Sequence, residues 1–145
     1  INLTRLLEQL VYEFQPVLDQ KGLTCRLAAG DDILLNCDAG KMQRVFDNLL
    51  RNAVNYSCDG TEIIIEAEQS EDSVTLEFSN RGGTIPREKL ERIFEQFYRL
   101  DTGRSSNGTG LGLAIAKQIV TLHKGTITAE SGGGVTVFTV VLPIS

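Results

Sequence analysis

The chain has 145 residues, of which 41% are apolar, and a formal net charge of −5. This length supports one domain with a substantial core and is too short for two. Acidic and basic residues are interspersed, which argues for a soluble globular protein and against a nucleic-acid-binding one.

Membrane insertion and metal or disulfide frameworks are not expected. No apolar run approaches the roughly 20 residues that span a bilayer, and the N-terminus carries no signal pattern. Cys25, Cys37 and Cys58 lack the C-x-x-C spacing of a zinc site. We therefore predict that all three cysteines are packing residues in a reducing cytosol.

The first forty residues predict one helix and two strands. Apolar residues between positions 2 and 20 recur at helical spacing, and Pro16 is expected to kink this helix. Apolar and polar residues then alternate over 23–27 and again over 33–37, which predicts two half-buried strands. Asp38 is the expected N-cap of the next helix.

Three asparagines follow one edge of that next predicted helix, which runs from Lys41 to Tyr56. Asn48, Asn52 and Asn55 are spaced i, i+4 and i+7, so their side chains form one stripe. Asparagine is a poor helix former, so three on one stripe require a reason. Either they are solvated amides, or their oxygens ligate a hard cation that also holds an anionic polyphosphate.

The middle of the chain predicts a hairpin and a turn. The alternating segments 62–67 and 74–78 predict two strands, and the second of them delivers Asn80. The residues 80–86 predict a tight turn, and Pro86 suits the start of a short helix that continues through Ile93.

Aromatic residues and a polar stretch come next. Phe94, Phe97 and Tyr98 predict a cluster in the core. The stretch from Arg99 to Gly108 has no apolar periodicity, and both a lid over a bound ligand and a plain surface loop are consistent with it.

Alternating glycines then lead directly into an apolar helical pattern. Without Cβ atoms, Gly108, Gly110 and Gly112 can turn their N–H groups toward one point, where the helix adds its positive end. This arrangement suits a phosphate. Thr109 stands where a Walker A loop needs Lys, and the spacing does not match a Rossmann fingerprint. A flexible loop that caps a buried helix is the other interpretation.

The last third predicts a helix and a hairpin. The helix from Leu111 to Leu122 is expected to be buried on most sides and to end at Gly125, with His123 placed for the helix dipole. Strands are predicted around 127–129 and 138–142, joined by three glycines. The whole order of elements predicts an α+β, two-layer sandwich with a mixed β-sheet covered on one face by about three helices.

Four motifs resemble, in order and spacing, those of the catalytic ATP-binding domain of bacterial sensor histidine kinases, in the superfamily shared with gyrase, Hsp90 and MutL. The residues 48–57 resemble the N box, 80–86 the first glycine box, 93–99 the F box and 108–113 the second glycine box. Because the resemblance covers nearly the whole chain, residues 1–145 are expected to form one such domain with the Bergerat ATP-binding fold.

The resemblance implies ATP and Mg²⁺ as cofactors and assigns roles to individual residues. Asn52 is the implied Mg²⁺ ligand, Asn80 the partner of the adenine amino group, and Tyr56 a residue that packs against the nucleotide. Asn48 and Arg104 are the implied catalytic residues, Asn48 near the phosphates and Arg104 in the lid. Further implied nucleotide contacts are Asn55, Gly82, Ile85, Phe97, Arg99, Gly108, Thr109, Gly110, Leu111, Gly112, Leu113 and Thr136.

Several positions depart from the family pattern. Asn80 stands where the family usually has Asp, which removes a charge-assisted hydrogen bond to adenine. Thr84 replaces a glycine, and Asn55 replaces a frequent Lys. The family's phosphoacceptor His lies on a helical hairpin that this chain lacks, and His123 is not placed to substitute for it, so we expect an excised catalytic domain.

The expected reaction is γ-phosphoryl transfer from Mg²⁺-bound ATP to a histidine on that separate hairpin. Asn48 cannot take a proton, which disfavours an ATPase of the gyrase type. A non-catalytic nucleotide-sensing or protein-docking module with a degenerate pocket is the stronger alternative.

The resemblance also implies partners and a location. The partners are the histidine-bearing dimerisation hairpin of the same kinase and a response regulator, and the isolated domain is expected to be monomeric. It is expected on the cytoplasmic side of a membrane-anchored sensor. Asn80 and the polar stretch containing Arg104 are similar to those of vancomycin-resistance sensor kinases of the VanS type, which implies control of glycopeptide resistance.

Overall fold

The computed structural model describes residues 1–30, 32–96 and 112–144. Their centre is a five-stranded sheet in the order β1-β2-β3-β5-β4. The strands are β1 (Thr24–Ala29), β2 (Glu62–Gln69), β3 (Ser73–Arg81), β4 (Thr126–Gly132) and β5 (Val135–Pro143). β1 pairs with β2 in parallel, and the other neighbours are antiparallel. The predicted mixed sheet is confirmed.

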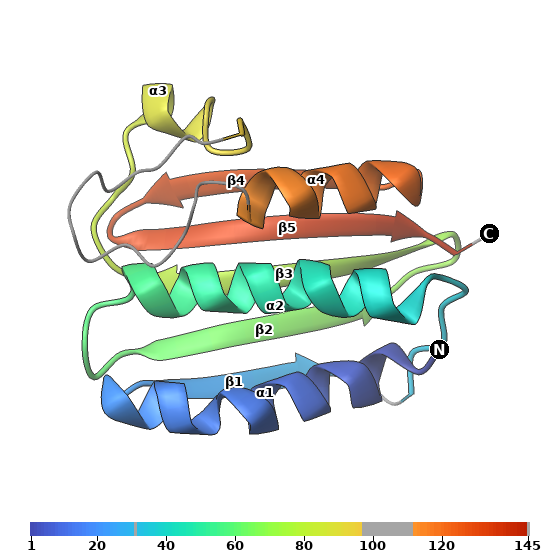
Figure 1. Cartoon of the computed structure of the whole chain (residues 1–145), viewed down its shortest axis with the longest axis horizontal. Coiled ribbons are helices and arrows are strands. Elements are labelled where there is room, and N and C mark those ends of the chain that lie inside the picture. The colour runs from blue at the N-terminus through green and yellow to red at the C-terminus, as the bar shows by residue number, and fades with distance from the viewer. Residues whose placement is uncertain (31, 97–111, 145) are drawn as a thin grey trace.

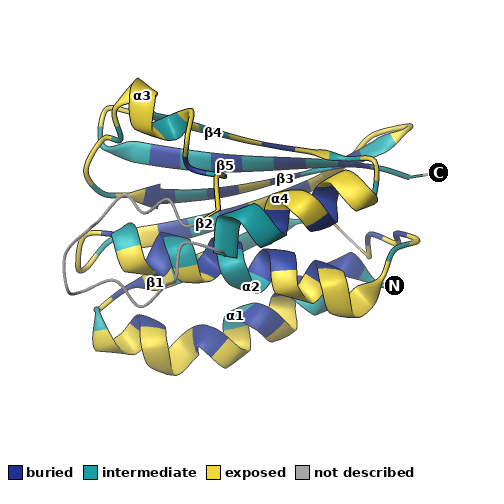
Figure 2. Ribbon diagram, turned by 45° about the horizontal axis from the view of Figure 1, so that its top comes forward, coloured by how far each residue is buried: buried dark blue, intermediate teal, exposed yellow. Residues whose placement is uncertain are grey.

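Helices cover one face of this sheet. Figure 1 shows α1 (Leu3–Gln20), α2 (Ala39–Tyr56) and α4 (Gly112–Leu122) side by side over the strands, while the short α3 (Arg87–Leu90) lies at the outer edge beside β4. Figure 2 shows buried residues on the sheet-facing sides of the helices and exposed residues on their outer sides. The amphipathic patterns of the sequence therefore become a two-layer sandwich.

Local hydrogen bonds define where the first two long helices begin. The Asn2 Oδ1 atom accepts from the Arg5 N–H at 3.1 Å, and the Asp38 Oδ1 atom accepts from the Lys41 N–H at 3.0 Å, so Asp38 is the N-cap that the sequence predicts. α1 continues on both sides of Pro16.

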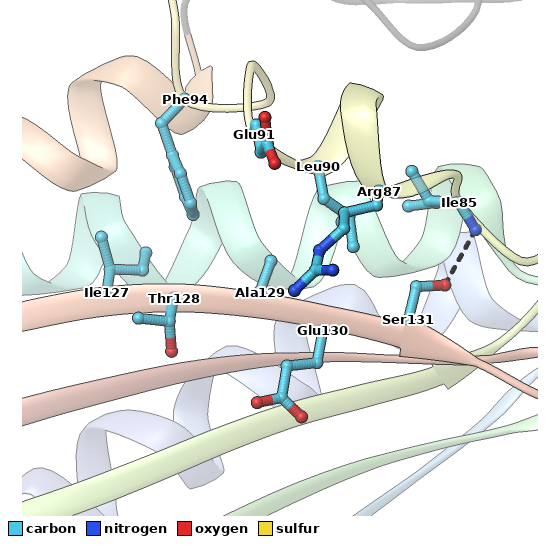
Figure 3. Close-up of a pocket in the computed structure, with 10 residues that line it drawn as sticks. All are labelled: Ile85, Arg87, Leu90, Glu91, Phe94, Ile127, Thr128, Ala129, Glu130 and Ser131. Carbon is cyan, nitrogen blue, oxygen red and sulfur yellow. Dashed lines mark hydrogen bonds between the residues drawn. The ribbon is translucent and has the colours of Figure 1, made fainter.

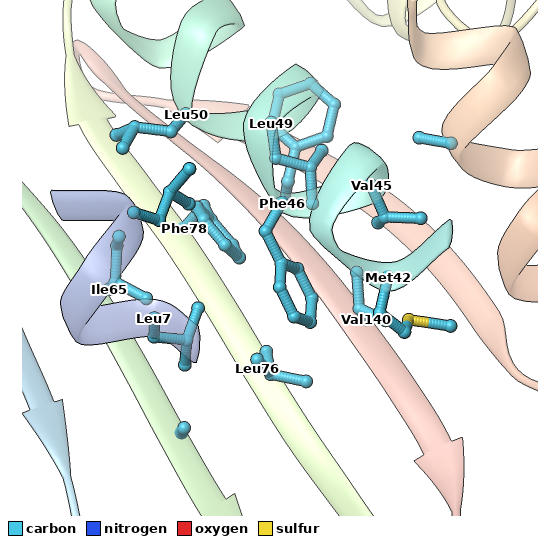
Figure 4. Packing of buried hydrophobic residues seen from close by; sticks show 14 of the residues in the cluster. Leu7, Met42, Val45, Phe46, Leu49, Leu50, Ile65, Leu76, Phe78 and Val140 are labelled. Carbon is cyan, nitrogen blue, oxygen red and sulfur yellow. The ribbon is translucent and has the colours of Figure 1, made fainter. Parts of the chain in front are cut away.

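The core lies between the helices and the sheet (Figure 4). Phe46 of α2 stacks on Phe78 of β3, with ring centroids 6.0 Å apart and planes at 26°. Phe138 of β5 meets Phe94 edge to face at the same centroid distance. Figure 4 shows leucine, isoleucine and valine side chains filling the space around the first pair.

The inward rows of β3 and β5 face each other along the sheet and end in polar residues. Phe78 pairs with Phe138, and the next inward pair toward the end of β3 is Asn80 with Thr136. Asn80 is 3% exposed and Thr136 is 4% exposed. The apolar core therefore changes into a buried polar pair at this end of the two strands.

The strand predicted over 33–37 is wrong. This segment makes a single isolated bridge, between Asn2 and Leu34. Its backbone bonds to the start of the chain instead: the Leu3 N–H donates to the Ile33 oxygen, and the Ile33 N–H donates to the Thr4 hydroxyl. Ile33 and Leu35 are buried as the alternation predicts. Their backbone groups, however, bond to the start of the chain and not to the sheet, Ile33 to Leu3 and Thr4 and Leu35 to Ile1.

The end of α4 also differs from the prediction. Leu122 is 65% exposed, so this helix is not buried on most sides. The left-handed residue after the helix is Lys124, at φ 62°, and the Gly125 N–H then donates to the Val120 oxygen at 2.9 Å. Gly125 is needed for space, because a Cβ there would overlap the carbonyl oxygen of Val141.

The cysteines have different environments. Cys25 and Cys37 are partly buried, but Cys58 is exposed, so the prediction that all three are packing residues is wrong for Cys58. Burial, with a smaller contribution from Glu62, raises the pKa of the Cys25 thiol to about 12. Burial also raises the pKa of Cys37.

No helix in the described ranges combines the length and the hydropathy that crossing a bilayer requires.

Candidate functional site

A cavity of about 230 Å³ lies beside the buried polar pair. The last turns of α2 form one wall, the turn after β3 and the start of α3 form another, and Asn80 and Thr136 lie between them. The lining residues are Asn52, Tyr56, Asn80, Gly83, Thr84, Ile85, Pro86, Lys89 and Thr136. The structure thus brings together five of the predicted nucleotide contacts: Asn52, Tyr56, Asn80, Ile85 and Thr136.

The side-chain amide of Asn80 is buried in this lining and has no hydrogen-bond partner among the residues that the structure describes. Among the described residues no hydrogen bond to this amide is found, although the residue is only 3% exposed. A buried amide without a hydrogen bond costs free energy, so such groups in folded proteins ordinarily have a partner. The Asn80 amide is therefore available to hydrogen-bond a molecule in this cavity.

Thr136 belongs to a short chain of hydrogen bonds. The Ile85 N–H donates to the Ser131 hydroxyl at 2.9 Å, as Figure 3 shows. The Ser131 and Thr136 hydroxyl oxygens lie 2.9 Å apart, and either can be the donor. These hydrogen bonds fix the turn after β3 to β4 and β5. They leave Thr136 able to donate a hydrogen bond to a molecule in the cavity or to accept one from it.

The structure gives a reason for glycine at position 82 that the sequence does not show. Its N–H donates to the Gly134 oxygen at 2.9 Å, and a Cβ at this position would overlap the carbonyl oxygen of Tyr56. Gly82 lets the turn pass against the end of α2, and it does not line the cavity.

Thr84, which replaces a glycine of the family pattern, has a bonding role of its own. Its hydroxyl accepts from the Gly134 N–H at 2.9 Å and so ties the turn after β3 to the β4–β5 hairpin.

The asparagine stripe of α2 divides into three environments. Asn52 lies half-buried in the lining of the cavity, and no hydrogen bond of its side chain is found among the described residues. Asn55 is exposed and lies outside the lining. The Asn48 Nδ2 atom donates to the Gly112 oxygen at 3.0 Å, so this amide joins α2 to the first residue of α4.

The lining residues are chemically suited to the base of a nucleotide and to a divalent cation. The unpaired Asn80 amide suits the edge of a base. The amide oxygen of Asn52 is the kind of hard, uncharged ligand that a divalent cation accepts beside phosphates.

The lining also contains residues that the sequence reasoning missed. Gly83, Thr84, Pro86 and Lys89 line the cavity. The first three lie inside the recognised glycine-box segment, so the motif could have pointed to them. Lys89 is an exposed lysine on a four-residue helix, and nothing in its sequence context distinguishes it from a solvated surface charge.

Several predicted contacts do not line this cavity or cannot be placed. Gly112 and Leu113, at the start of α4, are outside the lining. Phe97, Arg99, Arg104, Gly108, Thr109, Gly110 and Leu111 lie outside the described residues.

A larger cavity, of about 620 Å³, lies on the other side of Ile85, between α3, Phe94 and β4 (Figure 3). Its polar lining residues, which include Arg87, Glu91 and Glu130, are all partly or fully exposed. They are open to water, whereas Asn80 and Thr136 are only 3% and 4% exposed. The smaller cavity is therefore the candidate functional site.

The fold places a polar cavity between the asparagine-bearing helix α2 and the turn after the central strand β3. The chain belongs to the family of histidine kinase-, DNA gyrase B- and HSP90-like ATPases, whose profile matches residues 37–145. Among solved structures it is similar to the catalytic domain of the histidine kinase ThkA. The TM-score is 0.90 at 27% identity, and the match covers 99% of this chain and 93% of that one.

The similar curated proteins are sensor proteins. The chain is 45% identical over 144 residues to the sensor protein VanSC of Enterococcus gallinarum, covering 98% of this chain and 40% of that protein. It is 48% identical over 145 residues to the sensor protein VanS of Enterococcus faecium, covering 99% of this chain and 38% of that protein. The chain therefore spans about two fifths of the length of these relatives.

Proposed function

We propose that this chain binds Mg²⁺-ATP and transfers the γ-phosphoryl group to a histidine on a separate dimerisation hairpin, as the catalytic domain of a two-component sensor kinase. The observation that carries the proposal is the unpaired, buried Asn80 amide beside Asn52 in one cavity of an ATPase-family fold. The identity of nearly half of all positions to VanS and VanSC, over almost the whole chain, supports the sensor-kinase assignment.

In this proposal the residues of the chain bind and orient. Asn80 pairs with the base, Tyr56 and Ile85 pack against it, and the Asn52 oxygen ligates Mg²⁺. ATP supplies the transferable phosphoryl group and Mg²⁺ the positive charge that balances the phosphates. A histidine imidazole is itself a nucleophile, so the domain needs to position the phosphates more than to remove a proton.

Asn48 has a positioning role in the same proposal. Its amide cannot take a proton, and its Nδ2 atom already donates a hydrogen bond to the Gly112 oxygen. We assign it to holding the start of α4, where the second glycine box ends, against the helix that carries the Mg²⁺ ligand.

The wider setting belongs to the same proposal. We place the domain on the cytoplasmic side of a membrane-anchored kinase that signals through a response regulator and controls glycopeptide resistance. The two VanS-type relatives support this setting, because they are sensor proteins more than twice as long as the chain.

A phosphotransfer assay tests the proposal. The chain is mixed with ATP labelled at the γ-phosphate, Mg²⁺ and the dimerisation hairpin of a VanS relative. We expect acid-labile label on the hairpin, lost when the hairpin histidine is replaced by Gln and reduced by Asn52→Ala. No labelled hairpin despite measurable ATP binding would refute the kinase assignment and favour the nucleotide-sensing module.

A further inference from the structure

Two polar side chains of the cavity lining, Asn80 and Thr136, are not committed to one hydrogen-bonding pattern. Asn80 carries one acceptor and one donor on the same amide, and no described residue bonds to either. Rotation of the amide by half a turn exchanges the two positions at no cost in lost hydrogen bonds.

The hydroxyl pair behind Thr136 is reversible in the same way. If Ser131 donates to Thr136, the Thr136 hydroxyl hydrogen is free for the cavity. If Thr136 donates to Ser131, its oxygen is free to accept from the cavity instead. The Ser131 oxygen can accept from the Ile85 N–H in both arrangements, so neither leaves that backbone group unpaired.

A purine presents complementary groups on the edge of its six-membered ring. Adenine offers an amino donor at position 6 and an acceptor at N1. A 6-oxopurine offers an acceptor at position 6 and a donor at N1. A primary amide pairs with two groups of either edge by turning over, whereas a carboxylate only accepts and so opposes a 6-oxo group.

Resting on the proposed nucleotide function, we propose that this site takes 6-oxopurine nucleotides as well as adenine nucleotides, because Asn80 and Thr136 can each exchange donor and acceptor. The residue that would make the site selective for adenine is a carboxylate at position 80. The chain is thus a purine-nucleotide-binding domain whose choice of base depends on the side chain at position 80.

Calorimetric titration with ADP and with IDP, both in the presence of Mg²⁺, tests this directly, since the two bases differ only at this edge. For the wild-type chain we expect dissociation constants within about tenfold of each other, because one bidentate pair with a base replaces another of similar strength. For Asn80→Asp we expect the preference for ADP to rise by about tenfold or more, as the carboxylate cannot donate to the 6-oxo group.

Two further variants serve as controls. Gln43→Glu makes the same change from amide to acid on the exposed side of α2, and it is expected to leave the ratio of the two affinities at the wild-type value. Thr136→Val removes the reversible hydroxyl, and it is expected to weaken ADP and IDP by the same factor. If Asn80→Asp does not fold, the change in ADP and IDP affinity caused by Thr136→Val still tests the inference.

The outcomes separate this inference from the proposed function. A wild-type preference for ADP of more than about tenfold, an unchanged ratio in a folded Asn80→Asp, or unequal losses in Thr136→Val would overturn the inference alone. Failure of both nucleotides to bind the wild-type chain would overturn the proposed function together with it.

Discussion

At the scale of single residues, the site is defined by where buried polar groups interrupt an apolar row. Asn80 and Thr136 take the positions that follow Phe78 and precede Phe138 on the inward sides of their strands. The family resemblance predicts Asn80, in the first glycine box, and Thr136, outside both glycine boxes, as nucleotide contacts. It could not predict that Thr84 and Gly134 bond to each other, since that bond depends on the path of the turn.

Two glycines in the turn after β3 give a matched test. A Cβ at Gly82 would overlap the Tyr56 carbonyl, whereas a Cβ at Gly83 would meet no atom within 4 Å. Gly82→Ala is therefore expected to push the turn away from α2, to destabilise the fold by about 1–3 kcal/mol and to weaken ADP binding. Urea unfolding and calorimetry measure the two effects.

Gly83→Ala is the control for stability and is expected to stay within about 0.5 kcal/mol of the wild type. Equal stability of the two variants would show that the close approach at Gly82 is unimportant.

Cys25 predicts a dependence of stability on alkaline pH. Its pKa of about 12 in the folded chain lies above the ordinary value of 9.0, mainly because burial disfavours the thiolate and secondarily because of Glu62. The folded chain then holds this proton more tightly than the unfolded chain. The contribution to stability is intact below pH 9.0 and is lost as the pH rises toward 12.

Urea unfolding across this pH window checks the prediction. We expect the wild-type chain to lose more stability than Cys25→Ala over the window, while Cys58→Ala, which removes an exposed thiol, loses as much as the wild type. Parallel curves for the wild type and Cys25→Ala would contradict the assignment.

At the scale of elements, α4 is tied to α2 at both of its ends. At the start, Asn48 donates to the Gly112 oxygen at 3.0 Å. At the end, the His123 Nε2 atom accepts from the Asp38 N–H at 3.2 Å, and the Nδ1 atom donates to the Ile119 oxygen at 2.9 Å. Helical periodicity predicts each helix separately, but it carries no information on these tertiary bonds, so the role of Asn48 in joining α2 to α4 could not be read from the sequence.

Substitution of Asn48 tests the first of these ties. Asn48→Ala removes the donor and is expected to cost about 1 kcal/mol and to speed amide hydrogen exchange in the first turn of α4. Asn48→Asp is expected to cost more, because it sets a carboxylate against the Gly112 carbonyl.

Gln43→Ala removes an exposed amide from the same helix, and it is the control for a general effect of such a substitution on α2. Unchanged exchange at the start of α4 in both Asn48 variants would mean that this hydrogen bond does not hold the helix.

At the scale of the whole molecule, the sequence predicts the architecture well where the apolar side of each element is the side that faces the other layer of the sandwich. The amphipathic helices and the inward rows of β2, β3 and β5 have clear patterns, and the sandwich follows from them. One prediction failed where two parts of the chain could bond to the same backbone groups. The segment 33–37 alternates like a strand, but residues 1–4 at the start of the chain bond to the backbone groups of Ile33 and Leu35. The exposed Leu122 shows that an apolar residue in a helix pattern does not identify the buried side by itself.

Asn80 and Asn52 line the same cavity, and we propose that they hold a nucleotide and its metal ion. The most direct measurement is a calorimetric titration of the wild-type chain and of Asn52→Ala with a non-hydrolysable ATP analogue, with and without Mg²⁺, using Gln43→Ala as the control. We expect Mg²⁺ to strengthen binding about ten- to hundredfold in the wild type and in Gln43→Ala, and to have no effect in Asn52→Ala. Absence of binding to the wild type would contradict the nucleotide site. An effect of Mg²⁺ in Asn52→Ala equal to that in the wild type would contradict the role of Asn52 as the metal ligand.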